Sequence, residues 1–161
     1  MARLVLTDAS PLIGLSLVDG IPWLRTLFGT VTIPEEVLHE VVGRHFRGEA
    51  AIADAVTAGW LLPTGPAAVD AALPDLDEGE AACIRLALAA NVPALLLMDE
   101  RAGRAVAQEF GLQVAGTAAL IGMAKQRGLV TAAKPVMERL HRSDFRIAAE
   151  VIRTVLQRVG E

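Results

Sequence analysis

The sequence predicts a three-layer α/β/α domain, in which helices cover both faces of a central, mostly parallel sheet. Short apolar runs alternate with helical patterns along the whole chain, which is typical of a parallel sheet with crossover helices. Hydrophobic residues make up 53% of the 161 residues, much of that content is Ala and Leu, and aromatics are only 4%. This length fits one domain with its own core. We expect a single domain over residues 1–161, with residues 131–161 as a terminal helical extension.

Five short runs have the composition of buried strands. The first, RLVLT, ends in a polar turn, and the fourth, Ala94–Met98, is wholly apolar and follows Pro93. The others are β-branched or apolar and equally brief. The expected strands are residues 3–7, 30–33, 60–62, 94–98 and 112–115.

Helix starts are marked by caps, prolines and acidic first turns. Ser10 can cap a helix whose first position is Pro11, Pro34 opens another, and Gly116 and Thr117 cap a third. Pro and Ala dominate from Pro63 to Pro74, which we interpret as a surface connection. The expected helices are residues 10–18, 22–28, 34–43, 49–58, 76–91, 102–110, 118–127, 134–142 and 147–159.

Charge is distributed unevenly along the chain. Residues 1–100 hold 5 Lys and Arg against 14 Asp and Glu, whereas residues 101–161 hold 10 against 5. Such a division suits a protein that gathers cations in one place and anions in another, although solvated helix faces also produce it. The single Cys excludes a disulfide framework and a cysteine zinc site. The apolar runs are too short for a membrane helix, and Asp8 interrupts any signal-peptide core, so we expect a cytoplasmic protein.

Two aspartates directly follow predicted strands. Asp8 comes after the first strand and Asp99 after the fourth. Both are expected at the carboxyl edge of the sheet, where open α/β sheets hold their working crevice. A strand-end Asp is often only a cap or turn former. Two carboxylates that face each other repel, however, unless a positive group lies between them.

Glutamates on helices extend this acidic set. Glu80 shares a helix face with Ile84 and Ala87, and a buried Glu needs a partner or a metal. Its alternative role is a dipole acid that reaches solvent, and Asp77, one turn earlier, is an alternative acid. Glu40 borders another apolar stripe and competes with Glu36, whose first-turn position the helix dipole explains.

Acids that converge on one crevice indicate a hard divalent cation. Oxygen ligands favour Mg²⁺ or Mn²⁺, and His and Cys do not cluster with the acids. Such ions promote phosphodiester hydrolysis by activating water and stabilising the leaving oxygen. The sequence therefore predicts a metal-dependent hydrolase.

Five segments, in order, resemble the PIN-domain family over nearly the whole chain, particularly an uncharacterised prokaryotic branch similar to VapC toxins of type II toxin–antitoxin modules. These segments are TDASPLIGL at 7–15, IPEEVLHEVV at 33–42, LDEGEAACIRLA at 76–87, LLLMDERAGRAVAQEFGLQVAGT at 95–117 and AKQRGL at 124–129. The resemblance implies a metal-dependent endoribonuclease that cuts single-stranded RNA. It further implies a homodimer, with the exposed apolar helix surface as the contact, and a cognate antitoxin protein.

The resemblance also implies roles for individual residues. Catalytic carboxylates would be Asp8, Glu40, Glu80 and Asp99. Asp8, Glu80 and Asp99 would hold Mg²⁺ or Mn²⁺, with Glu40, Asp77 and Glu100 as alternative ligands. Ser10 would orient the first acid or a bound water.

Two departures from the family pattern bear on these roles. VapC-like toxins usually have Thr-x-Asp where this chain has Met98-Asp99-Glu100, so either of these acids could be the working one. The third acid is often Asp, whereas here it is Glu80. Arg101 and Arg104 could hold RNA phosphate or pair with the acids. A non-catalytic PIN-like module that binds a metal, nucleic acid or a partner is the alternative function. A phosphohydrolase of another family ranks lower, because residue 10 is Ser.

Overall fold

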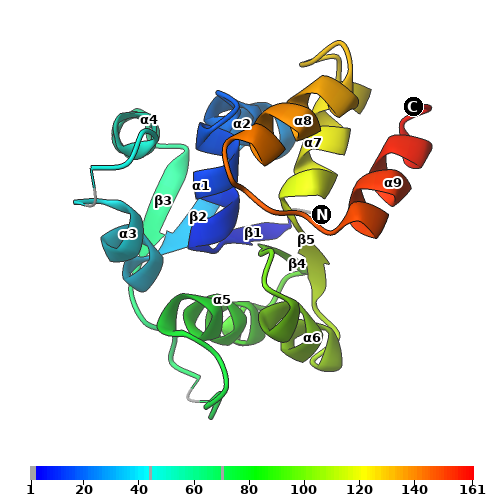
Figure 1. The fold of residues 1–161 in the computed structure, drawn as a ribbon. Helices are drawn as coiled ribbons and strands as arrows, with labels where there is room; N and C mark the ends of the chain where they lie inside the picture. The colour runs from blue at the N-terminus through cyan, green and yellow to red at the C-terminus, as the bar shows by residue number, and fades with distance from the viewer. Residues whose placement is uncertain (1–2, 44, 70) are drawn as a thin grey trace.

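A five-stranded parallel sheet forms the centre of the computed structural model, which describes residues 3–43, 45–69 and 71–161 (Figure 1). The strand order is β3-β2-β1-β4-β5, and each neighbouring pair is parallel. This arrangement confirms the predicted α/β/α fold class. The strands are β1 (Leu4–Thr7), β2 (Val31–Pro34), β3 (Leu61–Thr64), β4 (Ala94–Leu97) and β5 (Gln113–Ala115).

Helices cover both faces of the sheet. One face is covered by α5 and α6, and the other by α1, α2, α4 and α7, while α3 contacts both α1 and α5 (Figure 1). Among the described residues, no helix combines the length and apolar character needed to cross a membrane. The helices are α1 (Ala9–Ser16), α2 (Ile21–Phe28), α3 (Glu35–Val41), α4 (Glu49–Ala58), α5 (Glu78–Ala89), α6 (Arg101–Glu109), α7 (Thr117–Gln126), α8 (Ala133–Arg142) and α9 (Ala149–Arg158).

The strand order reverses beside β1. The chain passes from β1 through β2 to β3 at one edge, and then crosses to β4 and β5 on the other side of β1. β1 and β4 are in register from Leu4 opposite Ala94 to Thr7 opposite Leu97, so their carboxyl ends are level. Ligands of open α/β sheets bind at this kind of reversal, outside the carboxyl ends of the strands. Asp8 and Asp99 therefore flank the expected crevice.

Two apolar clusters hold the fold together. The main cluster joins the sheet to its covering helices. Its fully buried members include Leu6, Ile33 and Leu96 of the strands, Leu12 of α1 and Ile84 of α5. The second cluster joins α8 and α9 to α7. Burial of each such side chain contributes about 1.5–3 kcal/mol. The terminal helices are thus held by α7 rather than by the sheet.

The side chain of Glu161 ties the terminal helices together. Its carboxylate accepts hydrogen bonds from the N–H groups of Ala133 (2.7 Å) and Lys134 (3.1 Å), in the first turn of α8. It also pairs with Lys125 of α7 at 3.3 Å. A helix start leaves N–H groups without partners, and Ala132 at the N-cap offers them no side-chain acceptor. The last residue therefore caps a helix that is distant in sequence.

Two boundaries differ from the expectation. Strand β3 continues through Pro63 to Thr64, where we expected the surface connection to begin. Proline is tolerated there because β3 is an edge strand, which needs hydrogen bonds on one side only. Helix α1 begins at Ala9 with Asp8 as N-cap, not with Ser10, because the Ser10 hydroxyl bonds elsewhere.

Candidate active site

Asp8 lies buried at the junction of β1 and α1. Its N–H donates to the Leu97 carbonyl (2.9 Å), which extends the β1–β4 ladder by one residue, and the side chain is only 4% exposed. Burial, together with the neighbouring charges of Asp77, Glu80 and Glu40, raises the pKa of the Asp8 carboxyl to about 7, against a hydrogen bond from the Ala9 N–H, which lowers it. The sheet thus holds an acid where its charged form is disfavoured.

Asp77 and Glu80 form a capping box at the start of α5. Asp77 Oδ1 accepts from the Glu80 N–H (2.8 Å), and Glu80 Oε2 accepts from the Asp77 N–H (3.3 Å). Glu80 is 4% exposed, as expected from its position on the apolar face of the helix. Burial, and then the charge of Asp77, raise the pKa of the Glu80 carboxyl. The reciprocal bonds explain how two like charges stay adjacent.

Gly79 brings α5 close to two acids from other elements. A Cβ at this position would lie 2.8 Å from Asp8 Oδ1 and 3.4 Å from Glu40 Oε2, so these two oxygens share one small space. Real side chains almost never approach as closely as the first distance, so a larger residue here would displace the Asp8 carboxylate. Glu40 reaches this space from α3. The structure therefore gathers Asp8, Glu40, Asp77 and Glu80, which we name the acid cluster.

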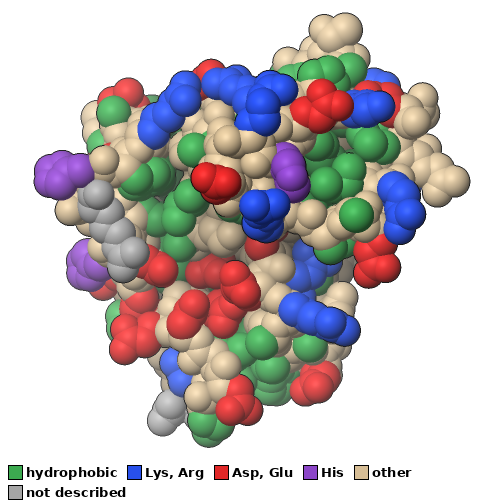
Figure 2. All heavy atoms as spheres, in the orientation of Figure 1, with side chains coloured by type: hydrophobic (Ala, Val, Ile, Leu, Met, Phe, Trp, Pro, Cys, Tyr) green, Lys and Arg blue, Asp and Glu red, His purple; other side chains and the backbone are tan. Residues whose placement is uncertain are grey.

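Within the described ranges of the chain, the acid cluster has no cationic partner. Among the described residues, Lys and Arg form ion pairs with Asp19 and Glu161, but with no member of the cluster. Figure 2 shows carboxylates gathered on the face where α3 and α5 meet below α1, with most Lys and Arg side chains away from them. Unpaired buried carboxylates are costly, because burial and mutual repulsion both disfavour their charge.

Asp99 belongs to a separate hydrogen-bonded group beside the cluster. Its Oδ2 accepts from the hydroxyls of Ser10 (2.9 Å) and Thr117 (2.8 Å), and its Oδ1 accepts from the Thr117 N–H (2.7 Å). From the sequence we expected Ser10 to orient the first acid or a bound water, whereas its hydroxyl donates to Asp99. We expected Thr117 only as part of a helix cap. Contacts between residues so distant in sequence leave no periodic signal.

Residues after Asp99 occupy different environments. Glu100 is exposed at the N-cap of α6, and its charge contributes to the raised pKa of Glu80, so this alternative acid faces the cluster. Arg104 is half-buried, and its Nη1 donates to the Met98 carbonyl (3.4 Å). Arg101 is exposed at the start of α6. Neither arginine is within ion-pair distance of a described carboxylate.

The side chains fit a hard divalent cation by donor type and charge. All the donors are carboxylate oxygens, which Mg²⁺ and Mn²⁺ prefer, and a cation would offset the charge crowding at Asp8. In the side-chain positions that the structure describes, no three His, Cys, Asp or Glu residues converge closely enough to hold an ion. The capping box contributes to the separation of these acids, because Glu80 Oε2 accepts a hydrogen bond from the Asp77 N–H.

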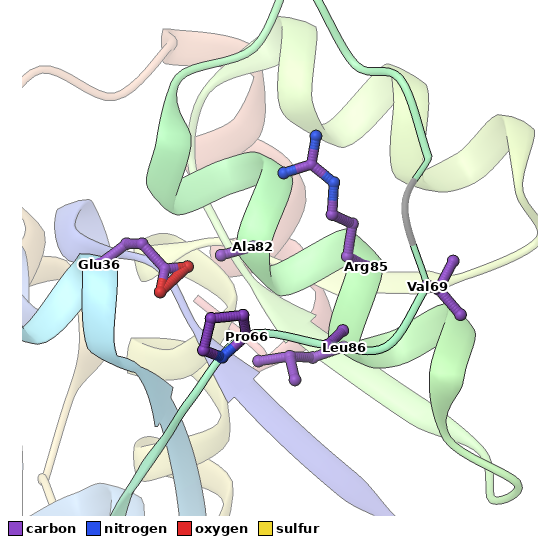
Figure 3. A pocket seen from close by; sticks show the side chains of 7 residues that line it. Glu36, Pro66, Val69, Ala82, Arg85 and Leu86 are labelled. Carbon is purple, nitrogen blue, oxygen red and sulfur yellow. The ribbon is translucent and has the colours of Figure 1, made fainter.

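A pocket of about 250 Å³ lies beside α5, separate from these acids. Figure 3 shows Glu36 of α3 and Arg85 of α5 on different walls. Glu36, the competitor of Glu40, therefore lies in this pocket, and the charges that raise the pKa of Asp8 include Glu40 but not Glu36. The remaining lining residues are Pro66, Ala67, Val69, Ala82 and Leu86.

Fold and site together define a parallel α/β domain that places carboxylates at its strand-order reversal. A sequence model described as a PIN domain matches residues 4–161. The chain therefore belongs to the PIN-domain family, as the sequence segments indicated. PIN domains are generally nucleases that act on nucleic acids and depend on divalent metal ions. No curated protein matches the chain.

Proposed function

We propose that the protein is a Mg²⁺- or Mn²⁺-dependent endoribonuclease that cuts single-stranded RNA. The observation that carries this proposal is the acid cluster, a set of carboxylates at the strand-order reversal that form no ion pair with any Lys or Arg the structure describes. Asp8, Glu80 and Asp99 hold the metal, with Glu40, Asp77 and Glu100 as further candidate ligands. When bound, the ion activates water and stabilises the charge of the leaving oxygen.

The individual acids contribute in different ways. Asp8 is the most constrained, because β1, β4 and Gly79 enclose it. Glu40 is half-buried and shares the space beside Gly79, which suits a group that accepts a proton at the edge of the site. Ser10 acts through Asp99. We propose Asp8, Glu40, Glu80 and Asp99 as the catalytic carboxylates.

RNA binding requires positive charge near an acidic site. Arg101 and Arg104 follow Asp99 directly on α6, and neither is neutralised by a described carboxylate. Arginine binds phosphate through paired N–H donors. We propose that these two residues hold phosphates on either side of the cut bond.

The biological setting follows from the resemblance to VapC toxins. We propose that the protein is the toxin of a type II toxin–antitoxin module, that a cognate antitoxin binds it, and that it acts in the cytoplasm as a homodimer. A toxin of this kind requires an inhibitor, because unrestrained RNA cleavage stops growth. Expression with and without the neighbouring reading frame tests the antitoxin, and light scattering tests the dimer.

One observation favours the alternative, a non-catalytic PIN-like module that binds a metal, nucleic acid or a partner. Glu80 is engaged in the capping box, and no three described acids converge on one ion. A module of this kind would bind Mn²⁺ or a basic segment without cutting RNA. Titration calorimetry with Mn²⁺, combined with cleavage assays on many RNAs, distinguishes binding from catalysis.

The deciding experiment compares wild type with Asp8→Asn on a labelled pool of single-stranded RNAs, in Mn²⁺ and in EDTA. We expect cleavage by wild type in Mn²⁺ only, and a rate at least about 100-fold lower for Asp8→Asn. The matched control is Asp19→Asn, an exposed acid that pairs with Arg139. Equal rates for wild type and Asp8→Asn, or cleavage unaffected by EDTA, contradict the proposal.

A further inference from the structure

We propose that Thr117 is a positioning residue of the site, which together with Gly116 and Ser10 forms a cradle that fixes the Asp99 carboxylate. This inference rests on the proposed function, because it concerns how one of its metal-binding acids is held. It assigns a role to the start of α7, which the sequence indicated only as a helix cap.

The first argument is the completeness of the hydrogen bonding at Asp99. Two hydroxyl donors fill Oδ2, and one N–H donor bonds Oδ1, at distances between 2.7 and 2.9 Å. Each carboxylate oxygen accepts two hydrogen bonds, so Oδ1 keeps one electron pair for another partner. The donors come from α1 and α7, which are separated in sequence from Asp99 by 89 and 18 residues. The carboxylate is thus fixed from two helices.

The second argument is the identity of residue 116. Gly116 has φ −95° and ψ −179°, an extended conformation that any residue adopts. The backbone therefore does not require glycine. A Cβ here would lie 2.8 Å from Asp99 Oδ1 and 2.8 Å from Arg104 Nη1, so glycine is needed for space alone. The absence of a side chain at residue 116 leaves room for the Asp99 carboxylate.

The third argument is that Asp99 needs external support. β4 ends at Leu97, two residues earlier, so the sheet itself does not fix the Asp99 side chain. Thr117 is fully buried, which shields its hydroxyl from competing water. Residues that orient metal-binding groups typically change metal affinity 10- to 100-fold when they are removed. A carboxylate held in advance also avoids the entropy cost of ordering it during binding.

The contact between Thr117 and Asp99 has two parts, one that supports the helix and one that positions the carboxylate, and substitutions can separate them. Asp99 caps α7 by accepting the Thr117 N–H, and that bond needs no side chain. The hydroxyl contributes only to the fixing of Oδ2. Thr117→Val has nearly the same shape, keeps the N–H and removes the hydroxyl, whereas Thr117→Ser keeps both donors.

The test measures Mn²⁺ affinity by titration calorimetry in the absence of RNA, with thermal melting to verify the fold. We expect Thr117→Val to weaken Mn²⁺ binding about 10-fold and Thr117→Ser to stay within about 3-fold of wild type. Thr154→Val is the matched control, because the Thr154 hydroxyl bonds only the Glu150 carbonyl within α9. It should leave the affinity unchanged. Asp99→Asn combined with Thr117→Val should bind no more weakly than Asp99→Asn alone, because the two residues act as one unit.

Several results overturn the inference. The inference fails if Thr117→Val binds Mn²⁺ as tightly as wild type, or if Thr117→Val and Thr117→Ser lose the same amount of Mn²⁺ affinity. It also fails if the loss in Thr117→Val adds to the loss in Asp99→Asn, or if Asp99→Asn binds Mn²⁺ as tightly as wild type. If Thr117→Val does not fold, Ser10→Ala replaces it, with Ser16→Ala in the same helix as control, because the Ser16 hydroxyl bonds only the Ile13 carbonyl. Wild-type affinity in Ser10→Ala then overturns the cradle. A wild-type protein that binds no Mn²⁺ refutes the proposed function itself. Wild-type affinity in Asp99→Asn removes Asp99 from the proposed metal ligands and refutes the cradle with it, whereas the other results refute the cradle alone.

Discussion

Carboxylates in two regions of the molecule face opposite kinds of neighbours. At the helical end, Asp19 pairs with Arg139 (2.9 Å), and a hydrogen bond from that arginine lowers the pKa of Asp19. Hydrogen bonds from the Ala133 and Lys134 N–H groups and from Lys125 lower the pKa of Glu161. At the edge of the sheet, burial and neighbouring acids instead raise the pKa values of Asp8 and Glu80.

The difference shows which acids serve the fold. Paired carboxylates at the helical end connect α7, α8 and the turn after α1, and their charge is favourable. The charged forms of Asp8 and Glu80 oppose folding, which is the pattern expected of acids retained for a functional site. Groups with strongly perturbed pKa values gather at functional sites for this reason.

The largest expected effect is on the pH dependence of stability without metal. The pKa of Asp8 rises from 3.8 in the unfolded chain to about 7 in the folded protein, so the folded state binds more protons between these values. Stability therefore decreases as pH rises from about 4 to 8, by up to roughly 3 kcal/mol from this group. Urea denaturation in EDTA at pH 4.5 and pH 8 measures it.

Asp8→Asn is the control for this pH effect. It removes the titrating carboxyl, and with it most of the decrease in the free energy of unfolding as pH rises. The carboxyls of Asp19 and Glu161 have lowered pKa values, so their contribution to stability is complete at higher pH and is lost as pH falls below about 4 to 5. Any change that they cause within the chosen window therefore has the opposite sign to that of Asp8. A wild-type stability that is equal at the two pH values would contradict the account of Asp8.

The second effect is stabilisation by a divalent ion. At pH 7.5 and a Mn²⁺ concentration 100 times the dissociation constant, the free energy of unfolding should rise by about 2.7 kcal/mol. The gain should disappear in Asp8→Asn and should persist in Asp19→Asn, which changes only the paired region. Thermal melting with and without Mn²⁺ measures it, and an equal gain in all three proteins would rule out the acid cluster as the binding site.

A pair of glycine substitutions compares the two regions directly. A Cβ at Gly79 would meet Asp8 Oδ1 at 2.8 Å, and a Cβ at Gly122 would meet Val155 Cγ1 at 2.7 Å. Each substitution to Ala should cost about 1–3 kcal/mol through overpacking. Only Gly79→Ala should also weaken Mn²⁺ binding. Equal Mn²⁺ affinities in the two variants, measured by calorimetry, would show that the space beside Gly79 does not matter to the ion.

The smallest effect is expected at the paired acid Asp19. Asp19→Asn removes the charge of a side chain that is 69% exposed, and Asn tolerates the positive φ of this position. Solvent screening limits the loss to about 0.5 kcal/mol. Urea denaturation at pH 7 measures it. A loss as large as that of Gly79→Ala would mean that surface pairing supports the fold more than we infer.

Local patterns were sufficient to predict the fold. Alternation of strands and helices predicted the sheet, and prolines, glycines and acidic first turns marked most boundaries to within two residues. Asp8 and Asp99 were predicted at the sheet edge because each directly follows a strand. The burial of Glu80 followed from its spacing to Ile84. All of these properties depend on residues close in sequence.

The contacts that organise the site could not be predicted in the same way. The bond from Ser10 to Asp99 and the bonds from Thr117 depend on how separate elements pack. One signal was nevertheless present. Gly79 lies in a helix, where glycine costs about 1 kcal/mol relative to alanine. Gly103 also lies in a helix, and a Cβ at this position would lie 3.0 Å from Glu80 Oε1. Two of the helical glycines thus lie beside acids of the candidate site.

Pro63 has a consequence for how copies of this protein can associate. It lies in β3, the open edge of the sheet, and has no N–H to offer an incoming strand. Edges interrupted in this way resist strand addition and fibre growth. β5, at the opposite edge, is only 3 residues long. Both sheet edges therefore disfavour the addition of a strand from a second molecule, and we expect any self-assembly to use helix surfaces.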